Sequence, residues 1–356
     1  MSIYLSLKTQ YENLGDEVIN GLMLRELCRR TDVVALAEGV PRWYIGNLKQ
    51  LLGDLADKIQ FVSSSTTFIR KLLAAGLFGP ESLMFTSCGD VSSTRSNYNR
   101  HLLFEALQYL PNLRLGMVGA SYSNVSRSEA RLLQVAHRRS SALSVRDRRS
   151  QQVLARSQVT VPVVPDLAFL MPTTAPASTG PNRDLALIML REVAHVPFGQ
   201  TLALTTNLAA NLKLNRLRPA ITWQVGRDAA FGLRLADAAE LPIVTPAEQT
   251  NGRFAKACEL YDRTAVIFSN RLHGLLVAGS RGAIPVALLD IQERKIRGIF
   301  EDAGLTDMIL PGDVGSIGAE DIEQVLRTDW QQLKAAFTRA SHDLHVFFDR
   351  VAGPVR

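Results

Sequence analysis

Two apolar patterns alternate along the first half of the chain. Short runs rich in β-branched and aromatic residues are typical of strands, and between them apolar residues recur every three or four positions, as in amphipathic helices. The predicted strands are residues 2–7, 33–38, 58–63, 82–87, 113–119, 142–146 and 159–164. Strands that alternate with helices form parallel sheets covered on both faces. The first half is therefore predicted to be a doubly wound α/β domain.

A break in this alternation separates two halves. Residues 171–184 (MPTTAPASTGPNRD) are rich in Pro, Thr, Ser and Gly and show no periodicity, which is typical of a linker. The alternation then restarts, and the predicted strands are residues 185–190, 221–225, 242–244, 265–269 and 285–289. The second half is therefore predicted to be another α/β domain.

The end of the chain has the periodicity of one long amphipathic helix. Its apolar residues fall at steps of three and four, at Trp330, Leu333, Phe337, Ala340, Leu344 and Phe347. We expect an N-terminal Rossmann-like domain (1–170), a linker (171–184), a C-terminal Rossmann-like domain (185–328) and a closing helix (329–356) that packs back across both. A chain of 356 residues can form two cores. Since such sheets bind ligands beyond the carboxyl ends of their strands, the two domains are expected to face a common cleft.

An excess of basic residues points to anionic partners. The net charge of +6 favours phosphorylated metabolites, nucleic acid or anionic lipid. Arginines cluster at residues 138–150 (RRSSALSVRDRRS), although such a run is also typical of a solvated surface. Aromatic residues are sparse and none alternates with this cluster, which argues against a nucleic-acid partner.

The three cysteines, Cys28, Cys88 and Cys258, lie far apart and form no C-x-x-C pair. An odd number of separated cysteines favours neither a disulfide framework nor a zinc site. No signal-peptide pattern opens the sequence, and no apolar run approaches the roughly 20 residues of a membrane-spanning helix. We therefore expect a cytoplasmic protein, with a basic surface suited to peripheral contact with an anionic membrane.

Common cofactor and metal motifs are absent from the sequence. It contains no G-x-G-x-x-G after a predicted strand, no G-x-x-x-x-G-K-[ST], no H-E-x-x-H and no D-x-D. His342 and His345 have a spacing that can hold a metal, but no third ligand lies near them in the sequence. We predict no tightly bound metal or cofactor.

The segment 265–279 (AVIFSNRLHGLLVAG) interrupts an apolar run with a guanidinium, an imidazole and a glycine. Its pattern predicts a buried strand and then a helix, so Arg271 and His273 lie at their junction. The first turn of a helix has unpaired N–H groups and a partial positive charge, and together with Arg271 it favours a carboxylate or phosphate. Gly274 is interpreted as a point where a ligand approaches the backbone. A surface arginine and a solvated histidine are the alternative, but two potential cations oppose the helix dipole, which a functional site would explain.

Several motifs occur in the order found in a known family. The segment S-N-R-L-H-G (269–274) is followed by an apolar helix, the strand IPVALL and Lys295. Before it come N-x-G-D, V-R-D-x-x-S, P-D and the arginine of IMLRE, formed by Asn13, Leu14, Gly15, Asp16, Val145, Arg146, Asp147, Ser150, Pro165, Asp166 and Arg191. From residue 3 to about residue 305 the chain resembles the polysaccharide pyruvyl transferase family. Two loops depart from the family pattern and are expected to face the acceptor: TSCGD (86–90) has one glycine, and LLDIQERK (288–295) lacks a tyrosine before the lysine.

The resemblance implies a glycosyltransferase-B-like fold and the transfer of pyruvate from phosphoenolpyruvate, as a ketal, onto a sugar of a bacterial-type surface polysaccharide or its precursor. The C-terminal domain would then hold the donor and the N-terminal domain the acceptor. By the same resemblance, His273 would protonate the enol of the donor. Arg271, Leu272, Arg146 and Arg191 would contact the donor.

The resemblance also places Asn13 and Asp16 at the acceptor, with Asp16 accepting from a sugar hydroxyl. Helix capping is the alternative role for Asp16. An ion pair with Asp147 or Asp166 is the alternative for Arg146. Asp166, which follows a proline, is interpreted as a turn residue.

Two other functions fit these observations. A nucleotide-sugar-dependent glycosyltransferase would share the fold and also hold a phosphorylated donor. A catalytically silent subunit of polysaccharide assembly would need neither Arg271 nor His273. The expected partners are phosphoenolpyruvate and a saccharide acceptor, free or lipid-linked; the acceptor sugar and the oligomeric state stay open.

Overall fold

The computed structural model describes residues 1–85, 88–91, 98–174, 183–245, 250–290, 293–312 and 317–355. The chain forms two compact units. The first comprises Met1–Tyr11, Asp16–Leu167 and His342–Arg356, and the second Glu12–Gly15 and Ala168–Ser341. Each unit contains a parallel sheet, so the predicted α/β class with two Rossmann-like sheets is confirmed. Most of the predicted linker, and parts of the loops 86–90 and 288–295, lie outside the described residues.

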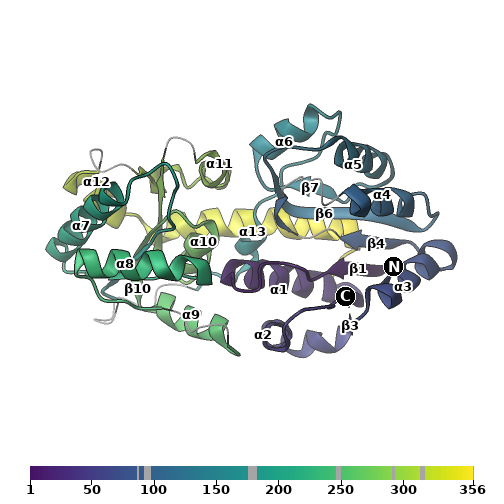
Figure 1. Cartoon of the computed structure of the whole chain (residues 1–356), viewed down its shortest axis with the longest axis horizontal. Helices are drawn as coiled ribbons and strands as arrows, with labels where there is room; N and C mark the ends of the chain where they lie inside the picture. Colours follow the sequence, from purple (N-terminus) through teal and green to yellow (C-terminus); the bar gives the residue numbers. More distant parts are fainter. Residues whose placement is uncertain are drawn as a thin grey trace. The chain divides into compact units, whose positions relative to one another are not determined.

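The sheet of the first unit has the order β3-β2-β1-β4-β6-β5, and β7 also pairs with β6 (Figure 1). All pairs are parallel, and β1 lies between β2 and β4, as in doubly wound sheets. The strands are β1 (Ser2–Ser6), β2 (Val33–Leu36), β3 (Ile59–Val62), β4 (Ser82–Phe85), β5 (Gly89–Val91), β6 (Leu113–Tyr122) and β7 (Leu143–Val145). The helices are α1 (Leu14–Cys28), α2 (Arg42–Leu52), α3 (Ser65–Phe78), α4 (Tyr98–Leu107), α5 (Arg127–Arg139) and α6 (Arg148–Ala155).

The prediction of a strand at residues 159–164 was wrong. Residues 159–164 make only an isolated bridge, between Val163 and Val145. Val145 N donates to Pro162 O at 3.1 Å and Val145 O accepts from Val164 N at 2.8 Å, but Pro162 has no N–H for a further ladder bond. A second proline, Pro165, follows at once, so the ladder cannot extend.

In the described part of the second unit, the sheet has the order β12-β11-β10-β8-β9, and all pairs are parallel. The strand order reverses between β8 and β10, so the carboxyl ends of these two strands mark a topological switch point, where such sheets bind ligands. The strands are β8 (Leu185–Met189), β9 (Arg218–Ile221), β10 (Thr264–Ser269), β11 (Ile284–Leu289) and β12 (Ile309–Pro311). The helices are α7 (Phe198–Leu214), α8 (Ala229–Ala239), α9 (Arg253–Asp262), α10 (Leu272–Ser280), α11 (Arg294–Ala303) and α12 (Ala319–Leu326).

Two strands predicted in this unit were misplaced. Residues 221–225 were expected to be a strand, but β9 ends at Ile221, and Val225 makes an isolated antiparallel bridge with Asn13. The ladder stops because its partner β8 ends at Met189, one residue after the last pair. Residues 242–244 are reduced to a single bridge with Ile221.

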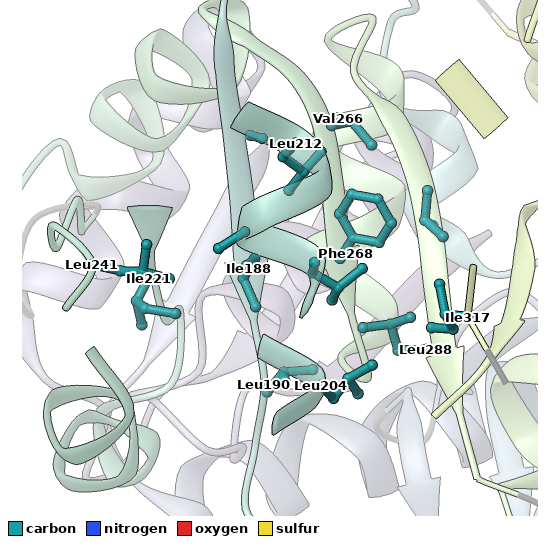
Figure 2. Close-up of a cluster of buried hydrophobic side chains, with 14 of the residues drawn as sticks. Ile188, Leu190, Leu204, Leu212, Ile221, Leu241, Val266, Phe268, Leu288 and Ile317 are labelled. Carbon is teal, nitrogen blue, oxygen red and sulfur yellow. The ribbon is translucent and has the colours of Figure 1, made fainter. Parts of the chain in front are cut away.

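The core of the second unit lies between one face of its sheet and the helices that cover it (Figure 2). Side chains that alternate along β8, β10 and β11 point to this face, and α7, α8 and α12 add aliphatic residues. Burial of each large apolar side chain stabilises the fold by about 1.5–3 kcal/mol. The core includes Ile188, Leu204, Leu212, Leu235, Val266, Phe268, Leu288 and Ile322.

The periodic segment at the end of the chain forms α13 (Trp330–Ala352). Its part up to Ser341 belongs to the second unit, where Phe337 packs edge-on against Phe169 with ring centroids 5.0 Å apart. Its remainder belongs to the first unit, where Asp349 Oδ1 accepts from Arg30 Nη2 at 2.6 Å. One continuous helix therefore belongs in part to each unit.

Candidate active site

Polar side chains tie together the ends of β8 and β10 at the switch point of the second unit. Ser269 Oγ donates to Met189 O at 2.6 Å and accepts from Arg271 N at 2.9 Å. Asn270 Oδ1 accepts from Arg191 N at 2.8 Å, and its Nδ2 donates to Arg191 O at 3.2 Å. The side chains of Ser269 and Asn270 thus hold the backbone at Arg271 and Arg191 in place.

Arg271 forms the N-cap position of α10, with extended backbone angles (φ −118°, ψ 110°) and no side-chain cap. Its Nε donates to Asp228 Oδ2 at 2.8 Å and its Nη2 donates to Asp228 Oδ1. The two side chains are only 14% and 9% exposed. Burial lowers the pKa of Arg271, Asp228 opposes this, and the positive charges of Arg191 and Arg227 lower it further. A bound anion would relieve this repulsion between three guanidinium groups.

A pocket of about 380 Å³ opens beside this ion pair. It is lined by Arg191, Glu192, Arg227, Asp228, Ala230, Phe231 and Arg271. The lining has three arginines and two carboxylates, so positive charge is in excess. α10 begins at the pocket wall, and the positive end of its macrodipole adds to this charge. Arg191 Nη2 also contacts Glu293 Oε2 at 3.1 Å, while its side chain stays 40% exposed. The pocket is suited to a small anion with more than one acidic group.

His273 lies in the first turn of α10 and packs directly against Gly15. A Cβ atom added to Gly15 would lie 2.4 Å from His273 Nδ1 and 2.6 Å from His273 Cβ. Any residue other than glycine would therefore displace the imidazole. The glycine of N-x-G-D and the histidine of S-N-R-L-H-G, which are 258 positions apart (273 − 15), meet in the second unit.

The residues before Gly15 anchor this contact. Leu14 N donates to Gln224 O at 3.3 Å, and Asn13 bridges to Val225. Asn13 Oδ1 accepts from Gly15 N at 3.0 Å, which is an N-cap interaction at the start of α1. The structure thus gives Asn13, expected to contact the acceptor, a role in positioning Gly15.

One interpretation of the RLHG segment needs correction. Gly274 was expected to let a ligand approach the backbone, but a Cβ atom there would lie 2.6 Å from Met189 Sδ, so the glycine allows α10 to pack on β8. Leu272, expected to contact the donor, has a buried side chain (6% exposed).

In the first unit, Arg146 forms a buried ion pair. Its Nη1 donates to Asp166 Oδ2 at 2.6 Å, its Nε donates to Ser121 Oγ at 2.7 Å, and both charged side chains are 1% exposed. Asp147 caps α6 by accepting from Ser150 N at 2.7 Å. V-R-D-x-x-S therefore holds β6, β7 and α6 together, and Asp166 is an ion-pair partner rather than a turn residue. We assign Arg146 to this ion pair, the alternative left open by the sequence.

Asp16 lies in the first turn of α1 in the first unit. Its Oδ2 accepts from Thr9 Oγ1 at 2.5 Å and from Gln10 N at 3.3 Å. Its carbonyl oxygen accepts from Asn20 Nδ2 at 2.8 Å. The carboxylate organises the loop after β1, which lies at the carboxyl edge of that sheet.

Asp228, Arg227, Ser269, Asn270 and Glu293 contribute to the site but were not found from the sequence. Asp228 lies 43 positions from Arg271 and follows residues 221–225, which were predicted to be a strand, so no local pattern marks it. Ser269 and Asn270 carried a usable signal, because two polar residues end an apolar strand there.

Within the described residues, no group of three or more His, Cys, Asp or Glu side chains is arranged to hold a metal ion. Among the described helices, none combines the length and the apolar character needed to span a membrane.

The two Rossmann-like units correspond to the fold of glycosyltransferase-B enzymes. A glycosyltransferase from Rickettsia africae matches with a TM-score of 0.56 and 13% identity, over 98% of this chain and 94% of the other. HepE from Anabaena, in complex with UDP and glucose, matches with a TM-score of 0.54 and 12% identity, over 98% and 95%. An O-GlcNAc transferase mutant from Thermobaculum terrenum matches with a TM-score of 0.50 and 14% identity. This match covers 99% of the present chain but only 65% of the O-GlcNAc transferase.

The sequence comparison defines the family. The family model "Polysaccharide pyruvyl transferase" matches residues 13–282, which include N-x-G-D, V-R-D-x-x-S and S-N-R-L-H-G. The chain therefore belongs to the polysaccharide pyruvyl transferase family, as its motifs predicted. A search of curated protein sequences finds no match to the chain.

Proposed function

We propose that the protein transfers the pyruvyl group of phosphoenolpyruvate onto a sugar of a surface polysaccharide or its precursor, as a ketal, and releases inorganic phosphate. The main support is the pocket in which Arg191, Arg227 and Arg271 gather at the switch point, in a chain of this family. Phosphoenolpyruvate carries a phosphate and a carboxylate, and guanidinium groups bind both in bidentate geometry. The pocket volume of about 380 Å³ fits a small ligand, for which sites of roughly 300–1,000 Å³ are usual.

In the proposed reaction, His273 donates a proton to the methylene carbon of the enol, and the phosphate-bearing carbon becomes oxocarbenium-like. A sugar hydroxyl adds to this carbon and loses its proton. The bond from this carbon to the phosphate oxygen then breaks, and phosphate departs with the electron pair. A second hydroxyl of the same sugar adds, loses its proton and closes the ketal. Such general acid catalysis typically contributes about 10²–10⁴-fold.

Asp16 is the proposed proton acceptor for a sugar hydroxyl. Its carboxylate lies in the first turn of α1, the helix whose residue Gly15 packs against His273.

The test is incubation of the purified protein with phosphoenolpyruvate and candidate oligosaccharides. Mass spectrometry reads the gain of one pyruvyl ketal and a phosphate assay reads the released phosphate. We expect both products in equal amounts, and loss of both in His273→Ala and Arg271→Ala. Biological output that is unchanged in both variants would instead favour a silent assembly subunit.

A nucleotide-sugar-dependent glycosyltransferase is the second candidate. It is favoured by the structural likeness to HepE, which was solved with UDP and glucose. Thermal unfolding with phosphoenolpyruvate, UDP-sugars and GDP-sugars separates the two, because a ligand that binds only the native state raises the melting temperature. Stabilisation by phosphoenolpyruvate alone supports the first function.

A further inference from the structure

An apolar surface of the first unit is not used by its core. α3 buries Phe68, Leu72 and Gly76, so its opposite face is left to solvent. On that face and on α4 and the turn after it, large apolar side chains are exposed: Leu73 (39%), Leu77 (46%), Phe78 (87%), Leu102 (40%), Leu103 (40%) and Tyr109 (67%). We call these residues the α3–α4 surface. Apolar clusters of this kind on a soluble protein mark interaction sites.

The end of α3 and the turn after α4 adjoin each other in the α3–α4 surface. Phe104 of α4 packs against two core clusters, one containing residues of α3 and the other residues of α5, so α4 lies between these helices (Figure 1). At the end of α3, Gly76 O accepts from Asn112 N at 3.0 Å. Leu110 also packs over Gly76, within 2.6 Å of where its Cβ would be. The exposed end of α3 therefore adjoins the turn that carries Tyr109.

Basic side chains border this surface. The exposed or half-buried charged residues of α3, of residues 109–114 and of α5 are all basic, because the acidic residue of α5, Glu129, is buried. The basic residues are Arg70, Lys71, Arg114, Arg127, Arg131, Arg138 and Arg139. Two of them have acidic neighbours: Arg114 Nε lies 3.9 Å from Oε1 of exposed Glu81, and Arg131 Nη2 lies 3.1 Å from Glu105 Oε1. Arg70 lies one helical turn before Leu73 and two before Leu77, so charge and apolar groups share one face of α3.

We propose that the α3–α4 surface docks the protein on an anionic lipid bilayer. Exposed Phe and Leu side chains inserted at the headgroup level, with arginines against acidic lipids, form the pattern of a peripheral membrane contact. A second copy of this chain fits less well, because a two-fold interface would place the same arginines against each other. Charge complementarity thus selects acidic lipid over self-association.

The position of the surface is compatible with activity in the bound state. The end of α3 and residues 109–114 lie where β4 and β6 begin. Parallel sheets bind ligands at the opposite edge, where Asp16 lies in this unit. Docking therefore leaves the carboxyl edge of this sheet open.

The experiment is co-sedimentation of the full-length protein with vesicles of phosphatidylcholine alone and of phosphatidylcholine mixed with phosphatidylglycerol. The variants are Leu77→Ser/Phe78→Ser and Arg70→Glu/Arg138→Glu. The control is Leu214→Ser, which alters an exposed leucine (80%) on α7 of the second unit. Circular dichroism checks that each variant is folded, and static light scattering measures its mass.

We expect binding to the phosphatidylglycerol vesicles only, weakening at high salt. The apolar double variant should bind at least about tenfold more weakly, because it loses the burial of two apolar side chains in the bilayer. The charge-reversal variant should lose at least as much, and Leu214→Ser should bind like the wild type. Absence of binding to both vesicles, or equal binding by all variants, overturns the proposal. A dimer that Leu77→Ser/Phe78→Ser dissociates overturns it in favour of a second copy. None of these readouts requires catalysis, so they are independent of the proposed function.

Discussion

Replacement of Gly15 by alanine tests whether the contact between the two motifs positions His273. The added Cβ would lie 2.4 Å from His273 Nδ1, 2.6 Å from its Cβ and 2.7 Å from its Cγ. Ordinary van der Waals contact begins at 3.4 Å, so the imidazole or the start of α1 must shift by about 1 Å (3.4 − 2.4). Because the clash includes His273 Cβ, rotation of the ring alone does not relieve it.

A shift of this size has a calculable consequence. Misplacement of a catalytic group by about 1 Å can lower the rate by about 10²-fold. Overpacking of this kind also costs about 1–3 kcal/mol of unfolding free energy. We therefore expect Gly15→Ala to reduce kcat by about two orders of magnitude and to change the KM for phosphoenolpyruvate little, because Arg271 and Arg191 are untouched.

The assay is phosphate release under saturating acceptor, with kcat and KM determined separately. Gly21→Ala is the matched control, since it lies in the same helix and its Cβ would approach Leu51 Cδ1 to 2.7 Å, away from His273. It should lose stability but keep its kcat. Equal kcat values for Gly15→Ala and Gly21→Ala would refute the positioning of His273 by Gly15.

Three further substitutions separate binding from folding. Arg271→Lys keeps the charge but loses the bidentate contact, so we expect the KM for phosphoenolpyruvate to rise about tenfold or more, measured by steady-state kinetics. Asp228→Asn leaves Arg271 partly buried without its counter-ion, so the melting temperature should fall. In thermal unfolding, phosphoenolpyruvate should raise the melting temperature of this variant more than that of the wild type. Asp166→Asn breaks the buried pair with Arg146 and should cost about 3–5 kcal/mol of unfolding free energy in urea titration, with KM unchanged.

Much of the fold was predictable because the two periodicities separate strands from helices. Strands buried on both faces, such as β8 and β10, leave clear apolar runs. The errors fell where a strand-like pattern lacked a partner. Residues 222–225 alternate like a strand although β8 has already ended, and residues 159–164 are interrupted by Pro162.

The candidate site was predictable where function depends on the end of a strand. Arg271 and Arg191 follow β10 and β8, and both line the pocket. Contacts between distant segments were not predictable, because Asp228 and Gly15 become relevant only once the chain is folded. Arg146 was recognised from its motif and expected to contact the donor. In the structure its side chain is buried in an ion pair with Asp166.

Calorimetric titration with phosphoenolpyruvate tests the central claim, that the arginine pocket binds a small molecule with two acidic groups. The wild-type protein should bind one equivalent, and Arg271→Ala, with an unchanged circular dichroism spectrum, should show no binding. Phosphoenolpyruvate that fails to bind the wild type, or binds Arg271→Ala equally well, would contradict the claim.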